Sequence, residues 1–376
     1  MIERYAETIW HGRTLGARAS RVALTPLSVV FAGAARARSF LYDHGWLPTR
    51  DAPLPVISVG NLRVGGSGKT PTVLWLVDRL RALGARPVVA MRGYGAGRAA
   101  PPIWLEPSGE ACAARAQALS GLGFRVVPLT RAERERGVSD EALLVALRSE
   151  VAVASTPNRQ TAAVAASAVG ADVLVLDDGF QHRRLHRDLD IVLTRRSESG
   201  ESVLPAGPLR EPWPALRRAH VVMAPESLVA PGDAIVVSAR TCPVGWVDRV
   251  SATVPLAPLA SWRRREVLAV AGIAQPGRFF EMLEQCGVRV RAGRVFGDHH
   301  RYTRDDWADI RASVRAGEWI VTTEKDLVKL HVLAEGDARL GALRVEMVVE
   351  PEADVVRLVR AAIPRLDAPQ GGPHDR

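Results

Sequence analysis

Lysine is scarce in this sequence. Only Lys69, Lys325 and Lys329 are lysines among the 50 basic residues of the 376-residue chain. A bias of this size toward arginine is typical of a skewed genomic base composition. It also makes each remaining lysine worth examining, and one of them, Lys69, lies in a glycine-rich segment.

Cysteine is also rare. Cys112, Cys242 and Cys286 lie far apart and form no C-x-x-C pair. This spacing excludes a zinc knuckle and a disulfide framework, and it fits a reducing cytoplasm.

Aromatic residues make up 5% of the chain, although its formal net charge is +9. The charge predicts an anionic partner such as nucleic acid, an acidic membrane surface or a phosphorylated ligand. Nucleic-acid modules usually carry aromatic side chains among basic ones or a recognition helix, and neither pattern is visible. We therefore expect no nucleic-acid partner.

A long apolar run is missing as well. The most apolar stretch, residues 23–35, is about half the ~20 residues that span a bilayer, and it contains Pro26. The start of the chain has no apolar core followed by a cleavage site, so we expect the protein to stay inside the cell. Residues 1–40 combine six arginines with a few aromatic side chains, which suits a segment lying in an anionic membrane interface. An N-terminal helical hairpin that covers the domain core remains the alternative.

The rest of the chain alternates short apolar strands with helical stretches, which is typical of a mostly parallel sheet with flanking helices. The expected strands are residues 55–60, 87–93, 151–155, 173–178, 190–195, 220–224, 234–239, 267–273, 288–296 and 319–323, and the expected helices are 72–84, 139–148, 276–286 and 303–315. The predicted fold class is α/β with a second, smaller α/β domain. The predicted division is an N-terminal membrane-associated helical segment 1–50, a phosphate-loop domain 51–240, a linker 241–260, a C-terminal domain 261–366 and a disordered tail 367–376.

A phosphate loop is predicted in the segment PVISVGNLRVGGSGKTP, which places a strand, a glycine-rich turn and a helix in succession. Backbone N–H groups of such a turn surround phosphates, the lysine reaches the outer phosphates, and the threonine hydroxyl ligates Mg²⁺. The ATP-binding residues are therefore expected to be Gly65, Gly66, Ser67, Gly68, Lys69 and Thr70. A strict motif has glycine where this chain has Arg63.

Two acids end a buried strand in VLVLDDGFQH. Phosphate-loop enzymes hold Mg²⁺ with a carboxylate at this kind of position, so Asp177 and Asp178 are predicted to be metal ligands together with Thr70. The alternative is a strand that ends in a solvated turn.

Several sequence blocks together resemble the tetraacyldisaccharide 4'-kinase family of phosphate-loop enzymes. The blocks are SVGNLRVGGSGKTP, MRGYG, SDEALLV, LVLDDGFQHRRLHRDLDIVL, LPAGPLREP, AGIAQPGRFF, FGDHHRYT and TTEKD, and they occur in the family's order. The resemblance implies transfer of the γ-phosphoryl group of ATP to the 4'-hydroxyl of tetraacyldisaccharide 1-phosphate, which gives lipid IVA at the cytoplasmic face of an inner membrane. It also implies two domains with the active site between them.

The same resemblance implies roles for individual residues. Glu211 in LREP corresponds to a further acid near the Mg²⁺ ion. Asp140 in SDEA and His299 in GDHH correspond to a proton-accepting pair from the two domains, with Lys69 acting on the phosphates. His300 is the alternative to His299.

The residues alone leave these two positions open. Asp140 follows Ser139 at a predicted helix start, where an acid often does no more than complement the helix dipole. The histidine doublet precedes Thr303-x-x-Asp306, which reads as a capping box, so it fits a loop structure or a metal site as well as a catalytic group. A phosphate-loop ATPase switch of the metal-insertion or partition type remains the main competing function.

Overall fold

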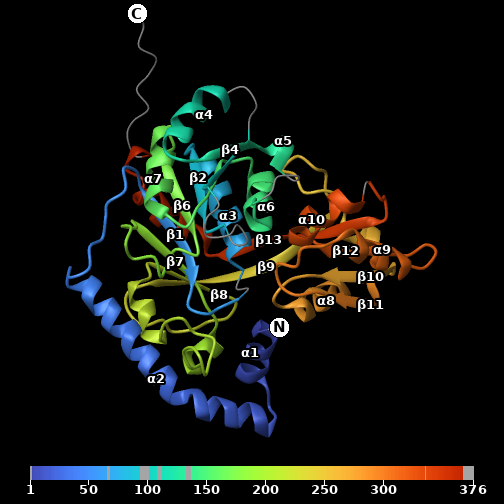
Figure 1. The fold of residues 1–376 in the computed structure, drawn as a ribbon, viewed down its shortest axis with the longest axis horizontal. Coiled ribbons are helices and arrows are strands. Elements are labelled where there is room, and N and C mark those ends of the chain that lie inside the picture. The colour runs from blue at the N-terminus through green and yellow to red at the C-terminus, as the bar shows by residue number, and fades with distance from the viewer. Residues whose placement is uncertain are drawn as a thin grey trace, which may run out of the picture.

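The computed structural model describes residues 2–65, 68–93, 101–107, 112–132, 137–334 and 336–366. The predictions for Gly66, Ser67 and the tail 367–376 lie outside these residues. In the described part, a continuous mixed sheet runs through the molecule and helices cover it (Figure 1).

Over the residues that the structure describes, the sheet has thirteen strands in the order β11-β10-β12-β13-β9-β8-β7-β1-β6-β2-β5-β3-β4. Neighbouring strands are parallel except for the pairs β3 with β5 and β13 with β9. We call strands β1 to β8 the phosphate-loop half and strands β10 to β12 the C-terminal half. The strands are β1 (Val56–Asn61), β2 (Pro87–Met91), β3 (Ile103–Glu106), β4 (Arg125–Pro128), β5 (Val153–Ser155), β6 (Val173–Asp177), β7 (Leu189–Leu193), β8 (Val221–Ala224), β9 (Ile235–Val247), β10 (Glu266–Ala271), β11 (Arg289–Val295), β12 (Trp319–Thr323) and β13 (Leu340–Glu350).

Helices pack on both faces of the phosphate-loop half, as the sequence predicts. One core cluster contains α3 and α6 side chains such as Leu76 and Leu144, and another contains α7 side chains such as Ala162. Strand residues alternate between the two clusters, because successive side chains point to opposite faces. The helices are α1 (Ile2–His11), α2 (Leu15–Asp43), α3 (Lys69–Ala82), α4 (Cys112–Gly121), α5 (Leu129–Ala132), α6 (Asp140–Ser149), α7 (Arg159–Ala168), α8 (Pro276–Gln285), α9 (Arg304–Ala312), α10 (Glu324–Ala334) and α11 (Glu352–Ala361).

Strand β9 joins the two halves of the sheet. It is 13 residues long and pairs with β8 on one side and with β13 on the other. Residues 241–247, which we expected to belong to a linker, form its second half. The proline in this stretch, Pro243, disfavours a strand prediction, and the register of the pair shifts opposite it, between Arg344 and Val345.

Three strands are absent from the sequence prediction: β3, β4 and β13. Strands β3 and β4 are only four residues long. Strand β13 mixes polar and apolar residues, and the exposure of its second half alternates. The apolar runs that identified the other strands are typical of strands buried on both faces, so these three gave a weaker signal.

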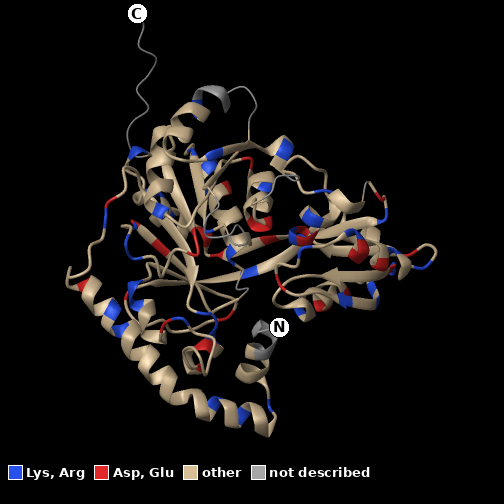
Figure 2. Cartoon of the chain, in the orientation of Figure 1, with Lys and Arg blue, Asp and Glu red and all other residues tan. Residues whose placement is uncertain are grey.

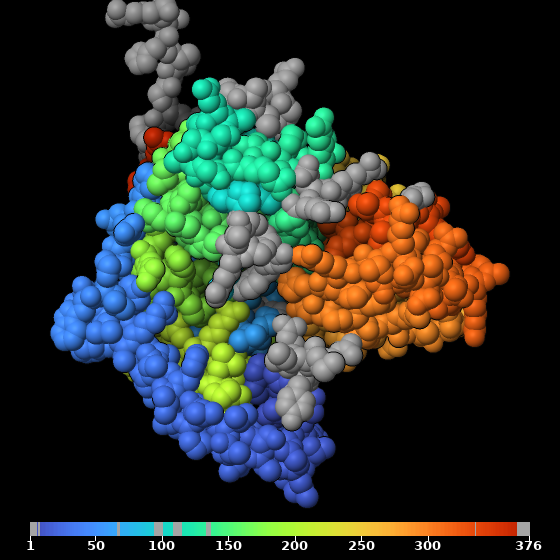
Figure 3. All heavy atoms as spheres, in the orientation of Figure 1, coloured from blue at the N-terminus to red at the C-terminus, as the bar shows by residue number. Residues whose placement is uncertain are grey.

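Two helices form the N-terminal segment. Helix α2 is 29 residues long and lies as a ridge along one edge of the molecule (Figures 1 and 3). In the described residues no helix is long and apolar enough to cross a membrane, in agreement with the expectation for residues 23–35.

Candidate active site

The phosphate loop leaves β1 at the centre of the sheet and enters α3 directly. Gly65 and Gly68 have φ values of 96° and 85°, a region that residues with a Cβ rarely adopt. The helix begins at Lys69, three residues earlier than the predicted start at residue 72, so Pro71 lies in its first turn. An N–H there has no partner within the helix, so proline costs nothing. The helix N-terminus therefore faces the loop, as phosphate binding requires.

Lys69 lies beside the carboxyl end of the neighbouring strand β6. Its Nζ donates a hydrogen bond to Oδ1 of Asn61 at 3.3 Å and lies 3.5 Å from Oδ1 of Asp178. Asp178 also accepts hydrogen bonds of 2.8 and 2.7 Å from Arg210. Strands β1 and β6 are parallel neighbours, so the loop and the two acids share one edge of the sheet.

Asp177 is the buried member of the acid pair. The pKa of Asp177 is raised to about 7: burial is the largest cause, the charge of Lys69 opposes it, and the charge of Glu141 on α6 adds to it. Its Oδ1 is buried and has no hydrogen-bond partner among the described residues. A buried carboxylate oxygen without a partner is costly, and a bound cation satisfies it.

Glu211 lies in the same half and is also buried. One of its oxygens accepts a 2.7 Å hydrogen bond from Arg218, and the other, Oε1, is buried without a partner in the described part of the chain. Thr70 is half-buried in the first turn of α3. The two orphaned carboxylate oxygens suit a hard cation such as Mg²⁺, which prefers oxygen ligands.

The predicted metal ligands do not form a preassembled cage in the described part of the chain. Among the described residues, no group of three or more His, Cys, Asp or Glu side chains is placed to hold a metal ion. Mg²⁺ at kinase sites is bound by one or two carboxylates together with substrate phosphates and water. The arrangement therefore fits an ion that arrives with a nucleotide, and the assignment of Thr70, Asp177, Asp178 and Glu211 stays a prediction.

We expect Asp177→Asn to weaken the Mg²⁺ dependence of catalysis, because a carboxamide keeps the shape but loses the charge that attracts the ion. The half-saturating Mg²⁺ concentration should rise by about 10-fold or more. The matched control is Asp172→Asn. Asp172 precedes the opposite end of β6, where it pairs with Arg86. Equal Mg²⁺ titrations for Asp177→Asn and the control would remove Asp177 from the metal site.

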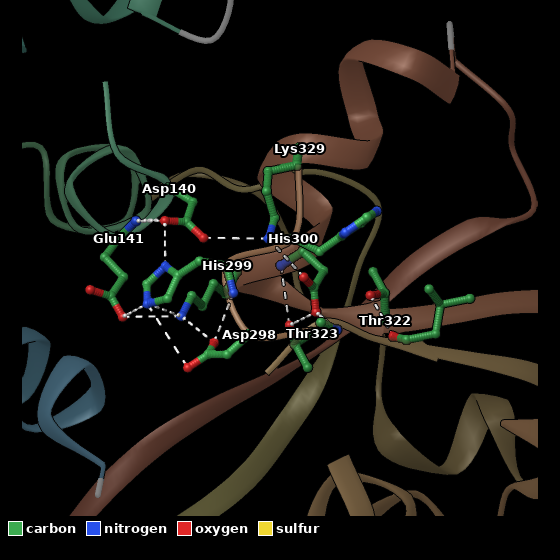
Figure 4. Close-up of polar contacts among 12 residues, drawn as sticks. Asp140, Glu141, Asp298, His299, His300, Thr322, Thr323 and Lys329 are labelled. Atoms are coloured by element: carbon green, nitrogen blue, oxygen red, sulfur yellow. Dashed lines mark hydrogen bonds and ion pairs between the residues drawn. The ribbon is translucent and has the colours of Figure 1, made fainter. Parts of the chain in front are cut away.

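Asp140 and His299 come together from the two halves of the sheet (Figure 4). Asp140 is the first residue of α6, and His299 follows β11 in a loop with a φ of 56°. The Nδ1 atom of His299 lies 3.2 Å from Oδ1 of Asp140. Left-handed backbone at a residue other than glycine costs about 1 kcal/mol or more, and it concentrates at functional sites. Asp178, with a φ of 55°, shares this feature.

The contact changes the pKa of both partners. The hydrogen bond that His299 donates to Asp140 raises the pKa of His299. Burial alone raises the pKa of Asp140, but the hydrogen bond from His299 and the charges of Lys325 and Lys329 outweigh burial and hold this pKa well below its usual range. The carboxylate of Asp140 is therefore ionised at neutral pH.

His300 points to a different partner. Its Nε2 lies 3.0 Å from Oδ2 of Asp306, and its ring stacks on Phe296. The predicted capping box of Thr303 and Asp306 is present at the start of α9, and Ser139 caps α6 as expected. The structure thus gives His300 a place in the loop and brings His299 to Asp140.

The two remaining lysines, Lys325 and Lys329, also lie beside Asp140 and His299. The sequence alone did not predict this placement. Lys325 is 3.1 Å from both Glu141 and Asp298, and Lys329 is 3.4 Å from Asp140. Both extend from α10, whose first residues belong to the TTEKD block. The scarcity of lysine was the available signal, since all three lysines of the chain lie in the site.

Arg63, which departs from the strict phosphate-loop motif, connects the loop to the N-terminal segment. Its side chain is buried, and its guanidinium lies 2.9 Å from Nε2 of His11 and 3.5 Å from Glu201. The long side chain therefore takes part in packing beside the loop, where the strict motif has glycine.

Comparison with known proteins assigns this arrangement to a family. The sequence model of the tetraacyldisaccharide-1-phosphate 4'-kinase family matches residues 20–118 and 121–363. This chain belongs to that family. The match spans both halves of the sheet and most of the residues described above, so the family relationship covers the whole candidate site.

Individual family members agree over nearly the full length. The tetraacyldisaccharide 4'-kinase of Halorhodospira halophila is 38% identical, covering 93% of this chain and 95% of that protein. The tetraacyldisaccharide 4'-kinase of Anaeromyxobacter dehalogenans is 40% identical, covering 88% and 87%. A crystal structure of LpxK from Aquifex aeolicus in complex with ATP superposes with a TM-score of 0.73 at 29% identity, covering 91% of this chain and 99% of that one. These relatives decide for a kinase over an ATPase switch and confirm the predicted fold class.

Proposed function

We propose that this chain transfers the γ-phosphoryl group of ATP to the 4'-hydroxyl of tetraacyldisaccharide 1-phosphate and so forms lipid IVA. The observation that carries the proposal is the contact of Asp140 with His299 across the two halves of the sheet. Together with the phosphate loop, this pair supplies the two parts that a sugar kinase needs: a phosphate-binding element and a group that accepts the hydroxyl proton.

The reaction assigns each part a role. The 4'-hydroxyl oxygen forms a bond to the γ-phosphorus, the bond from that phosphorus to the β–γ bridging oxygen breaks, and ADP leaves. The hydroxyl proton passes to the Asp140–His299 pair. Lys69 and the N-terminus of α3 stabilise the charge of the transferring group, since both present positive charge to the phosphates.

Asp177, Asp178, Glu211 and Thr70 are the residues that would hold Mg²⁺. When bound, the ion neutralises charge on the β- and γ-phosphates. Asp178 is held by Arg210 and Lys69, and the pKa of Asp178 is lowered because the charges of these residues outweigh burial. Its carboxylate therefore stays available as an anion.

The two members of the proton-accepting pair come from different parts of the chain, which supports the proposal of two structural units, 51–240 and 261–366, with the site between them. Asp140 belongs to the first and His299 to the second, and β9 with β13 connects them. In this proposal, the geometry of the proton-accepting pair depends on how the two units sit against each other.

The direct test incubates the purified chain with ATP, Mg²⁺ and tetraacyldisaccharide 1-phosphate. Mass spectrometry should find a product with one added phosphate and place it at the 4'-position. A matched acceptor without the 4'-hydroxyl should give no product. ATP hydrolysis at the same rate with and without the acceptor, and no phosphorylated lipid, would contradict the proposal.

We also propose that α2 docks on an anionic inner-membrane surface at its cytoplasmic face. Its outer side carries an apolar row at seven-residue spacing, and the protein itself leaves this row uncovered: Leu15 is 85% exposed, Val22 72% and Val29 66%. Arginines lie near both ends of the helix (Figure 2). Exposed apolar side chains flanked by arginine suit the interface of an anionic bilayer, where both find favourable partners.

Polar contacts tie the helix to the body, among them hydrogen bonds that Arg183 donates to Ser39 and Asp43 near its C-terminus. Ser28 accepts a hydrogen bond from the backbone of Ala206, and Arg38 donates one to the carbonyl of Gln181. These contacts fix which face of α2 points outward. They also mean that changing exposed residues on α2 tests docking without removing the helix, whereas a deletion would uncover the surface beneath it.

We expect Val22→Glu with Val29→Glu to reduce sedimentation with vesicles that contain anionic lipid, because both side chains would have to enter the interface with a charge. The matched control is Val229→Glu, at a position that is 90% exposed outside α2. Sedimentation equal to the control would place the docking surface elsewhere.

A further inference from the structure

Helix α10 presents two lysines to the Asp140–His299 pair. Lys325 and Lys329 are four residues apart, so they lie on the same face of the helix. Lys329 Nζ lies 3.4 Å from Oδ2 of Asp140. Lys325 Nζ lies 3.4 Å from Nε2 of His299. The contact between Asp140 and His299 uses Oδ1 and Nδ1. Lys329 therefore faces the second carboxylate oxygen of Asp140, and Lys325 faces the second ring nitrogen of His299.

The contact of Lys329 with Asp140 acts through charge. Asp140 Oδ2 and Lys329 Nζ are both buried and make no hydrogen bond with any described residue, so their interaction is an ion pair. The two side chains are only 11% and 16% exposed. An ion pair with so little solvent is screened much less than one on the surface.

Lys329 is held in place from its own side of the interface. Its Nζ lies 3.0 Å from Oδ1 of Asp326 and 5.2 Å from the centre of the Tyr302 ring. Asp326 is fully buried and accepts hydrogen bonds from the backbone of Gly272 and from Thr323. The ammonium group is thus fixed to the C-terminal half and meets the carboxylate of the other half at a set position.

Lys325 is held by two carboxylates from opposite sides. Its Nζ donates to Glu141 of α6 and to Asp298 of the loop after β11, both at 3.1 Å. Burial opposes the charge of Lys325, but Glu141 and Asp298 outweigh it and raise its pKa. The lysine stays protonated and can donate only. A donor facing Nε2 of His299 favours the tautomer that carries its proton on Nδ1, next to Asp140.

We propose that Lys325 and Lys329 are positioning residues for phosphoryl transfer: Lys329 fixes Oδ2 of Asp140, and Lys325 fixes the ring of His299. This inference rests on the proposed roles of Asp140 and His299. Both lysines belong to one helix, so α10 assembles the pair as a unit when the two halves meet. Neither lysine contacts the phosphate loop in the described residues.

The test measures kcat, the KM for ATP and the pH profile of Lys325→Met and Lys329→Met. A misplaced pair should lower kcat by about 10- to 100-fold, while the KM for ATP stays within about twofold. The acidic limb of kcat should move to higher pH, because removing a positive charge raises the pKa of Asp140 and of His299. The other charged residues that face the pair, Glu141 and Asp298, are not substituted in either variant.

Two further variants separate positioning from folding. Lys329→Arg keeps the charge, so its acidic limb should stay at the wild-type pH even if the larger head group lowers kcat. Arg311→Met removes a cation of the adjacent helix α9 that pairs with Asp337 outside the site. It should leave the pH profile unchanged. If Lys329→Met fails to fold, the charge-conserving variant and Lys325→Met carry the test.

The outcomes are distinct. The positioning role would be overturned if both methionine variants kept the wild-type kcat and the wild-type acidic limb while Asp140→Asn was inactive. This result would leave the proposed pair intact. Full activity of Asp140→Asn and His299→Ala would overturn the pair and this inference with it. A lowered kcat with an unshifted acidic limb would make the lysines structural contacts only, which also contradicts the proposal.

Discussion

Lys69→Ala should lower phosphoryl transfer by at least about 10²- to 10³-fold, because the side chain supplies positive charge where the transition state develops negative charge. Folding should be little affected. Lys69 is part-buried, and among the described residues its polar contacts are with Asn61 and Asp178, which keeps its two hydrogen bonds with Arg210. Rates with saturating ATP and Mg²⁺, together with thermal unfolding, measure the two effects separately.

The matched control is Arg79→Ala on the same helix. Arg79 pairs with Glu352 outside the site, and both side chains are about 40% exposed. An ion pair with this exposure contributes about 0–1 kcal/mol to stability and nothing to the reaction. Unchanged turnover in folded Lys69→Ala would contradict the phosphate-loop assignment, whereas equal losses in both variants would indicate a general effect on α3.

Asp140→Ala and His299→Ala should each lower kcat by at least about 10²-fold, and the double variant should be little worse than the worse single variant. Residues that act as one unit are strongly non-additive, because removing either partner already removes the function of the pair. Rate constants of the four proteins, measured under one set of conditions, give the coupling directly. Additive losses would mean that the two residues act separately.

The pH profile gives an independent check with a fixed sign. Burial raises the pKa of Asp140, and the hydrogen bond from His299 is the leading influence that lowers it. His299→Ala removes that hydrogen bond, so the pKa of Asp140 should rise and the acidic limb of the residual activity should move to higher pH. An acidic limb at its wild-type position would show that His299 does not control the protonation of Asp140.

His300→Ala serves as the internal control for the dyad. His300 contacts Asp306 and stacks on Phe296, so its loss should reduce stability slightly and leave kcat near the wild-type value. If His300→Ala abolishes activity and His299→Ala retains it, the proton-accepting residue is His300, and the contact seen between His299 and Asp140 serves the loop structure instead.

Parts of the site could be read from the sequence because they are local. A strand, a glycine-rich turn and a helix start within 17 consecutive residues define the phosphate loop, and two acids at the end of an apolar strand define the neighbouring carboxylates. Their proximity also follows from the sequence pattern, because parallel strands bring their carboxyl ends to one edge. The capping box at Thr303 and Asp306 is equally local, and the structure confirms it.

Other parts depend on residues that are far apart in the chain. Strand β13 pairs with β9 about 100 residues earlier, and its mixed composition carries little sign of this partner. Lys329 and Asp140 are 189 positions apart, and Lys325 and Glu141 are 184 apart. No local pattern encodes such contacts, which arise only when the two halves of the sheet pack.

The sequence by itself determined the chemistry of this protein: a phosphate loop with one lysine, paired acids beside it, and blocks typical of a lipid kinase family. The tertiary structure decided which histidine faces Asp140 and that both lysines of α10 meet the pair. The physical reason is that local backbone preferences and strand patterns act over a few residues, whereas the partners of a buried charge are set by the packing of whole elements.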